Sequence, residues 1–192
     1  MKKIDKISYY LRIYFVILSK AKELLLLIAI FFFIATQTSF AASPYVLPYP
    51  SAMPGGVSYK LHIVWEKIMQ YWYFGDFGQY TYNLKESDKY LVEAKTLFEY
   101  NQYLLGFAAL QKSNTYFAHV QPFLEKAKQD GKNITENQLA LQQAAAKHIE
   151  VLQKMENETP SDFTWTPEKN PSSTLHIHQL IQQAIEERQK DL

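Results

Sequence analysis

Apolar residues recur at helical spacing along most of the chain beyond residue 57. The first stripe, with spacings of four, three and four, is Leu61, Trp65, Ile68 and Trp72. It predicts a helix over residues 58–73, which the segment Phe74 to Gly78 interrupts. Similar stripes predict helices that begin near residues 79, 103, 135 and 173, and Pro122 ends or kinks the second of these. With no convincing strand pattern, the sequence predicts an all-α fold, a small antiparallel bundle of about four to five helices.

Proline-rich segments divide the chain into parts. Residues 42–56 contain four prolines and Gly55-Gly56, and we interpret them as an extended leader that acts as a spacer. Residues 159–172 contain three prolines and are predicted to be a linker. The bundle is therefore expected over residues 57–158, with a separate C-terminal amphipathic helix over residues 173–192. This last helix is the most polar, so we expect it to pack loosely or to seek a partner.

The N-terminal 41 residues have the pattern of an export segment. Basic residues precede Leu24 to Ala35, a run of twelve residues without a polar group. Ser39-Phe40-Ala41 then offers small residues at both positions that a signal peptidase reads, so cleavage is expected between Ala41 and Ala42. An uncleaved membrane anchor is the alternative, because Ile7 to Leu18 is also largely apolar and a spanning helix needs about 20 apolar residues. In both cases the later part is expected outside the cytoplasm, secreted or membrane-anchored.

Charge and cysteine content narrow the classes of function. Lys and Arg number 20 and Asp and Glu 19, of which six and two lie in the first 41 residues. Residues 42–192 therefore have a formal net charge of −3, which argues against nucleic-acid binding. The chain has no cysteine, which excludes disulfides, thiolate metal sites and thiol nucleophiles. Because small exported eukaryotic domains often depend on disulfides, we interpret the source as bacterial.

Residues 54 to about 100 contain residues typical of helix starts and helix breaks in a fixed order. This order consists of a proline, a helix opened by Tyr and Lys, an acidic residue, an aromatic break and a Leu-x-Glu-Ala-x-x-Leu run. The residues at these places are Pro54, Tyr59, Lys60, Glu66, Phe74, Leu91, Glu93, Ala94 and Leu97. In this order the chain resembles the bacterial family known as domain of unknown function 5667, although Tyr90 stands where that family usually has Arg. The resemblance implies an exported or membrane-tethered helical domain and assigns no activity or catalytic residue.

The sequence contains no recognisable catalytic, cofactor or metal site. His176 and His178 are two residues apart, and on a helix they would point in nearly opposite directions rather than share a metal. His148 lies on an apolar stripe, so we expect it to be a buried, hydrogen-bonded histidine. The chain lacks a Gly-x-Ser-x-Gly motif, a phosphate loop and a dinucleotide fingerprint. We therefore predict no enzyme activity and no cofactor.

Aromatic residues are concentrated between positions 65 and 82. They are Trp65, Tyr71, Trp72, Tyr73, Phe74, Phe77, Tyr80 and Tyr82. Trp65 and Trp72 follow the apolar stripe and are assigned to the core, whereas Tyr71, Tyr73 and Tyr80 lie off it and are candidate partner-binding residues. The expected function is an exported or membrane-tethered helical interaction or structural module at the bacterial surface. The alternative is a soluble extracytoplasmic binder of a glycan, peptide or small ligand through the aromatic patch.

Overall fold

The computed structural model describes residues 20, 22, 43–50, 53–54, 57–169 and 171–192. The chain divides into two compact units, residues 1–41 and 42–192. The predicted export run Leu24 to Ala35 and the predicted cleavage site at Ala41 and Ala42 lie outside the described residues. Within the described part of the chain, no helix is long and apolar enough to cross a bilayer.

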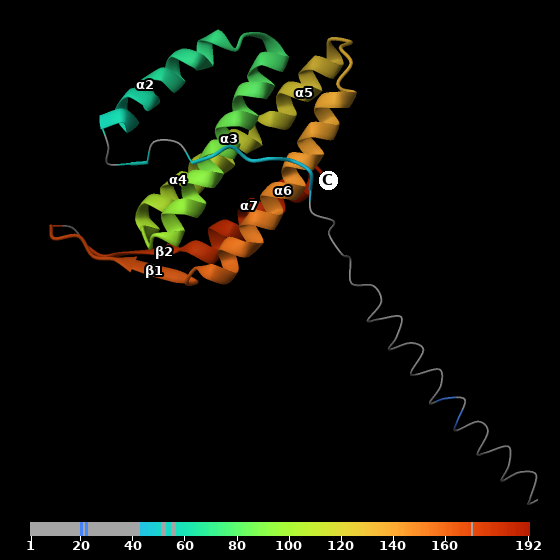
Figure 1. The fold of residues 1–192 in the computed structure, drawn as a ribbon. Coiled ribbons are helices and arrows are strands. Elements are labelled where there is room, and N and C mark those ends of the chain that lie inside the picture. Colours follow the sequence, from blue (N-terminus) through green and yellow to red (C-terminus); the bar gives the residue numbers. More distant parts are fainter. Residues whose placement is uncertain (1–19, 21, 23–42, 51–52, 55–56, 170) are drawn as a thin grey trace, which may run out of the picture. The chain divides into compact units, whose positions relative to one another are not determined.

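The second unit is mostly helical, which confirms the predicted fold class (Figure 1). Its helices are α2 (Val57–Trp72), α3 (Gly75–Glu99), α4 (Tyr103–Ala118), α5 (Val120–Gln129), α6 (Thr135–Glu158) and α7 (Ile177–Gln189). Two short strands, β1 (Asp162–Trp165) and β2 (Ser173–His176), precede α7. The helix predicted to begin near residue 103 is divided in two, because α4 ends at Ala118 and α5 begins at Val120, before Pro122.

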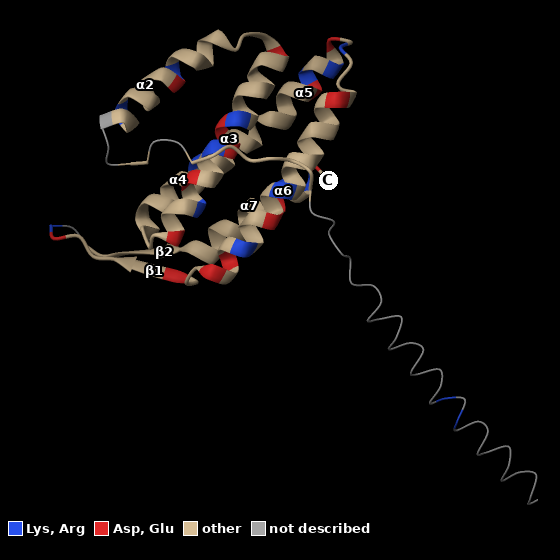
Figure 2. Cartoon of the chain, in the orientation of Figure 1, with Lys and Arg blue, Asp and Glu red and all other residues tan. Residues whose placement is uncertain are grey.

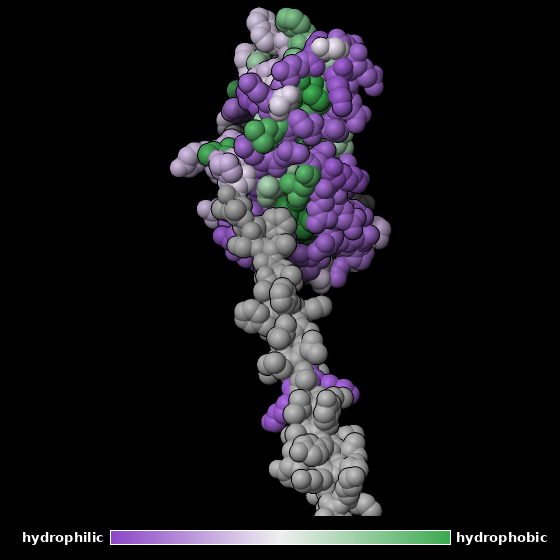
Figure 3. Space-filling view, turned by 90° about the vertical axis from the view of Figure 1, so that its right-hand side faces the viewer, coloured by the Kyte–Doolittle hydropathy of each residue, from purple (hydrophilic) through white to green (hydrophobic). Residues whose placement is uncertain are grey.

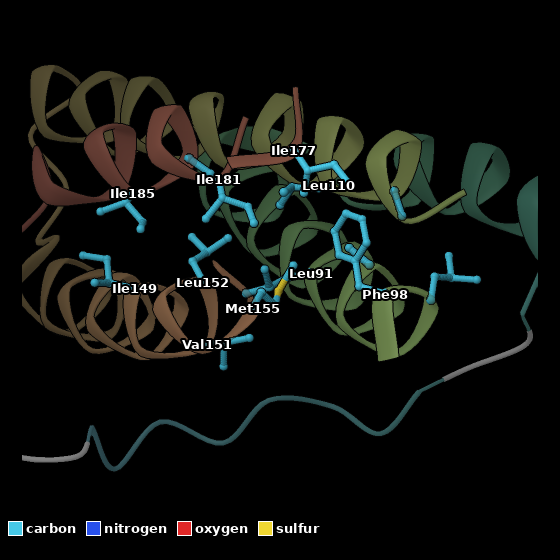
Figure 4. Packing of buried hydrophobic residues seen from close by; sticks show 14 residues of the cluster. Leu91, Phe98, Leu110, Ile149, Val151, Leu152, Met155, Ile177, Ile181 and Ile185 are labelled. Carbon is cyan, nitrogen blue, oxygen red and sulfur yellow. The ribbon is translucent and has the colours of Figure 1, made fainter. Parts of the chain in front are cut away.

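One core cluster lies among α3, α4, α6 and α7. Its fully buried large side chains include Leu91, Leu110, Leu152, Ile177 and Ile181. Figure 4 shows Ile181 and Ile185 of α7 facing Leu152 and Ile149 of α6, while Ile177 lies beside Leu110 of α4. A second cluster joins α3, α5, α6 and the end of α4, and it contains Tyr80, Leu84, Phe117, Val120, Leu124 and Leu141. Both clusters lie within residues 42–192, so this unit has its own apolar core.

The segment predicted to be a linker and a loosely packed helix is an integral part of the bundle. β1 pairs antiparallel with β2, with Phe163 opposite Leu175, so the expectation of no strands was wrong. Four-residue strands are too short for a clear two-residue periodicity, which explains why the pattern was missed. α7 begins only at Ile177, and its apolar stripe is fully covered rather than free for a partner.

The proline-rich leader is extended but does not act as a spacer. Residues 43–50 have no regular secondary structure, and they lie across the bundle (Figure 1). The Ser43 hydroxyl donates to the carbonyl of Gln143 on α6, at 2.7 Å. Tyr45 and Leu47 pack against the two core clusters, so alternate side chains of the leader point inward. The prolines prevented a helix, as predicted, and left a strand-like segment that binds the bundle surface.

Candidate partner-binding surface

The outer face of α2 is apolar and exposed. We use this name for the six side chains that share one arc of roughly 120° on the helix, Leu61, Val64, Trp65, Ile68, Tyr71 and Trp72. Trp65 is 59% exposed and Trp72 74%, so their assignment to the core was wrong, and Ile68 on the same stripe is 52% exposed. Covering all six would be worth on the order of 10 kcal/mol. An exposed stripe of this size is typical of a surface that another molecule covers.

The inner face of α2, which is opposite the outer face, lies against α3 and forms polar contacts with it. Tyr90 donates its phenolic hydrogen to Glu66 Oε2 at 2.8 Å, and Lys89 forms an ion pair with the same carboxylate. Tyr59 donates to Glu93 Oε1 at 3.1 Å. Glu66 is therefore buried although it belongs to a helix whose apolar face is exposed. We call this polar layer between α2 and α3 the seam.

Burial in the seam shifts the protonation of its members. Desolvation raises the pKa of Glu86 to about 7, and the nearby Glu93 adds to the rise. Desolvation also raises the pKa of Glu93 and lowers that of Lys89. The pKa of Tyr59 rises to about 12 through burial and the adjacent Glu93 charge. The seam thus holds carboxyl groups that ionise less readily than usual, and this weakens the attachment of α2 compared with an apolar contact.

The corner between α2 and α3 is fixed by two glycines and a glutamine. Gly75 has φ +74°, which favours glycine, and it opens α3 directly after the break. A Cβ on Gly78 would lie 2.9 Å from the carbonyl carbon of Tyr73, so only glycine allows this close approach. The Gln79 amide donates to the carbonyls of Gln70 and Tyr73 at the end of α2. These contacts set the direction of α2 independently of the seam.

Two open hollows flank α3 near the seam. One, about 210 Å³, lies between α2 and α3, with Trp65, Tyr73 and Tyr82 among its lining residues. The other, about 400 Å³, lies between the leader and α3 and is lined partly by Val46 and Tyr49. Lys85, Glu86 and Lys89 line both hollows. Ligand sites in proteins are usually about 300–1,000 Å³, so the first hollow is small and the second lies near the lower limit.

The three tyrosines predicted to bind a partner occupy different environments. Tyr71 is 86% exposed on the outer face of α2. Tyr73 is half-buried in the first hollow, where its ring lies 5.8 Å from that of Tyr82. Tyr80 is buried in the second core cluster and donates to the carbonyl of Asn137, at 2.9 Å. Tyr80 is therefore removed from the candidate surface, since it cannot reach a partner.

A second polar group is buried in the bundle centre and joins α3, α6 and α7. Arg188 Nε donates to Nδ1 of His148 at 2.9 Å, so Nε2 of the neutral imidazole donates to Asp88 Oδ1 at 2.7 Å. Arg188 also donates to Ser113 on α4, and Tyr45 of the leader donates to Asp88 Oδ2. The prediction of a buried, hydrogen-bonded His148 is confirmed.

This Asp88–His148–Arg188 network acts in the fold rather than in chemistry. His148 and Arg188 have no exposed surface, so a substrate cannot reach them. Burial, opposed by the Asp88 hydrogen bond, lowers the pKa of His148 to about 4. Asp88 and Arg188 were not predicted, although both continue apolar stripes at helical spacing, after Leu84 and Ile185 respectively. Asp88 and Arg188 could have been predicted from the sequence, because each is a charged residue at a position that an apolar stripe would occupy.

The remaining histidines do not form a metal site. His176 is exposed on β2 and pairs with Asp162 at 2.5 Å, whereas His178 lies on α7 and contacts the carbonyl of Thr159. Among the described residues, no group of three or more His, Asp or Glu side chains is arranged to hold a metal ion. Comparisons with protein-family models, curated proteins and solved structures found no match. The resemblance of residues 54–100 to domain of unknown function 5667 therefore stays a prediction.

Proposed function

We propose that the protein is an exported or membrane-tethered helical module that acts through binding at the bacterial cell surface. The observation that carries the proposal is the outer face of α2, which leaves Leu61, Ile68 and Trp72 largely in water. A folded domain gains no stability from such a face, so its retention is explained best by an external contact. The hydrophobic run at residues 24–35 supports the cellular location.

A binder of a small, glycan or peptide ligand is the second candidate. The hollow between the leader and α3 favours it, because its volume of about 400 Å³ falls within the usual range of ligand sites. Tyr49 is almost fully exposed beside this hollow, where a sugar ring could stack on it. The lining of this hollow carries both signs of charge, since Lys85 and Lys89 lie there together with Glu86 and Asp88.

The location is tested by the intact mass of the protein from the membrane and soluble extracytoplasmic fractions of a bacterial host. A species that begins at Ala42 in the soluble fraction would indicate a diffusible domain. A full-length species in the membrane would indicate a tethered module. Recovery of the chain only from the cytoplasm would contradict both forms of the proposal.

The contact surface is tested by replacing Tyr71 with alanine and crosslinking the protein in place. Because Tyr71 is exposed and makes no described contact, the variant should keep the wild-type melting temperature and lose crosslinked partners. The matched control is Tyr100→Ala, which removes another exposed tyrosine far from α2 in the sequence. Equal partner recovery from both variants would exclude the outer face of α2. Retained binding of a glycan by both would favour the hollow.

A further inference from the structure

We propose that the outer face of α2 lies in the interfacial region of an anionic lipid bilayer, with the helix axis along the membrane plane. The proposal rests on the membrane-tethered form of the proposed function, in which the export segment is retained, and it names the partner of the same surface. The six apolar side chains cover about a third of the circumference of α2, which is the width that an interfacial helix buries.

The residue types of this face suit the boundary between headgroups and acyl chains. Trp65, Tyr71 and Trp72 are aromatic side chains with a polar atom, and such side chains concentrate at membrane interfaces. Leu61 and Ile68 lie between them and can enter the upper acyl region. Phe74, 86% exposed directly after the helix, extends the apolar surface. Protein interfaces are also rich in Trp and Tyr, so the choice of a lipid partner depends on the charges beside these rings and on the tether.

The charges of α2 match an anionic surface. Lys60 and Lys67 are exposed and lie next to each other along one edge of the apolar arc. The only acidic residue of α2, Glu66, is buried in the seam (Figure 2). The helix thus presents two cations and no anion, although residues 42–192 as a whole have a net charge of −3. Lysines beside an apolar face can extend their ammonium groups to phosphates while their methylenes stay in the interface.

The face of the bundle over α5 and α6 does not offer a competing apolar surface. The view from the side of α5 and α6 shows a mainly hydrophilic surface with separate hydrophobic spots (Figure 3). The seam holds α2 through its inner face, so the outer face can enter a membrane without any core contact being lost. Membrane binding therefore requires no unfolding of α3–α7.

A tether makes a short interfacial helix sufficient. Twenty-one residues separate Ala35, the end of the predicted export run, from Val57 at the start of α2. At about 3.3–3.6 Å per residue this chain spans at most about 75 Å, so α2 stays close to the membrane. The effective concentration of the membrane is then far higher than for a free peptide, and a weak affinity gives high occupancy.

The test uses the full chain reconstituted in vesicles of equal parts phosphatidylcholine and phosphatidylglycerol with brominated acyl chains. Bromine quenches tryptophan only at close range. In a Trp165→Phe chain the remaining tryptophans are Trp65 and Trp72, so the emission reports the outer face of α2. Emission should fall at least twofold relative to vesicles without bromine. In vesicles of phosphatidylcholine alone, the quenching should be clearly weaker.

The matched control retains only Trp165, on β1, in a Trp65→Phe, Trp72→Phe chain, and its emission should stay nearly constant. A Lys60→Glu, Lys67→Glu chain keeps all apolar residues and should lose most of the quenching, since both lysines are exposed and the fold does not depend on them. Equal quenching of Trp165 would show general closeness to the bilayer and overturn the proposal. Unchanged quenching in the charge-reversed chain would also overturn it.

Flotation separates this proposal from the proposed function. If the chain floats with the vesicles but Trp65 and Trp72 are not quenched, tethering stands and the role of α2 is wrong. If the chain does not float, the lipid assignment and the tethered form of the proposed function both fail, and only the secreted form remains. An Ile68→Cys chain, with no other cysteine, reports the competing occupant. Efficient formation of disulfide-linked dimers by this chain would assign the face to a second copy and overturn the lipid assignment.

Discussion

Three buried charged or polar side chains show what a sequence reveals about a core at the residue scale. Asp88, His148 and Arg188 each occupy a stripe position, and the sequence predicted burial only for His148. Helical spacing gives the inward direction of one side chain, but the partners lie 40 and 60 residues away in the chain. The pairing of these buried side chains depends on which helices pack against each other. Periodicity within one helix does not reveal its neighbours.

His148 should make the folded state sensitive to acid. Its pKa is about 4 in the folded state and about 6.5 in the unfolded chain, so only the unfolded chain binds a proton between these values. The free energy of unfolding therefore falls as the pH decreases from 6.5 to 4, by up to about 3 kcal/mol from this residue. A His148→Gln variant is less stable near neutral pH because Arg188 and Asp88 lose their common partner.

The measurement is urea unfolding of residues 42–192 at several pH values, with wild type and His148→Gln compared. The stability difference between the two proteins should shrink towards pH 4, because only the wild type has the buried imidazole. A His62→Gln variant is the control, since His62 is exposed. A constant difference over the whole range would show that His148 does not titrate in this way.

Glu86 should have the opposite effect on stability. Its pKa is about 7 in the folded state and about 4.5 when exposed, so the folded carboxyl keeps its proton where the unfolded one is ionised. The wild type should lose stability as the pH rises from 4.5 to 7, by about 2 kcal/mol after allowance for solvent screening. Glu86→Gln, which cannot ionise, should gain that amount over wild type in the same window. Equal pH profiles of the two proteins, measured by urea unfolding, would refute the assignment.

At the scale of the elements, the sequence predicted the existence of α2 correctly and its orientation wrongly. The stripe from Leu61 to Trp72 is a helix face, but periodicity does not say whether other residues cover it. The inner face of α2 carries Tyr59 and Glu66, whose partners on α3 are the polar groups of Glu93 and Tyr90. The β1–β2 hairpin was missed because Pro160, Pro167 and Pro171 were interpreted as the marks of a structureless linker.

From the polar contacts of the seam we predict that α2 unfolds locally more easily than the other helices. Its attachment consists of polar contacts that water replaces at low cost, whereas α3, α4, α6 and α7 share an apolar core. In residues 42–192 the amides of α2 should exchange with deuterium at least about tenfold faster than those of α7. Hydrogen–deuterium exchange read by mass spectrometry measures this difference. Protection of α2 equal to that of α7 would mean that the seam is as stable as the core.

At the scale of the whole molecule, the division into a bundle of residues 57–158 and a separate last helix differs from the structure. The isoleucines of α7 are buried in the same cluster as Leu91, Leu110 and Leu152 (Figure 4). The leader also belongs to the folded unit, because Tyr45 reaches the central network through Asp88. The apolar stripe of α7 was recognised in the sequence, but the polar residues on its outside led to the wrong expectation that the helix packs loosely.

The integration of α7 predicts that a chain from Ala42 to Glu158 cannot fold cooperatively. Its removal would expose Leu152 and Leu110 and leave His148 and Asp88 without the Arg188 guanidinium. Loss of three buried isoleucines alone is expected to cost roughly 6–12 kcal/mol, which is comparable to the total stability of a domain of this size. Circular dichroism during heating should show a broad, non-cooperative transition for this chain.

The control replaces Val57–Trp72 with a Gly-Ser segment of equal length and should still melt cooperatively, because α2 contributes to neither core cluster. A sharp transition of the shortened chain would show that α3–α6 form a domain on their own.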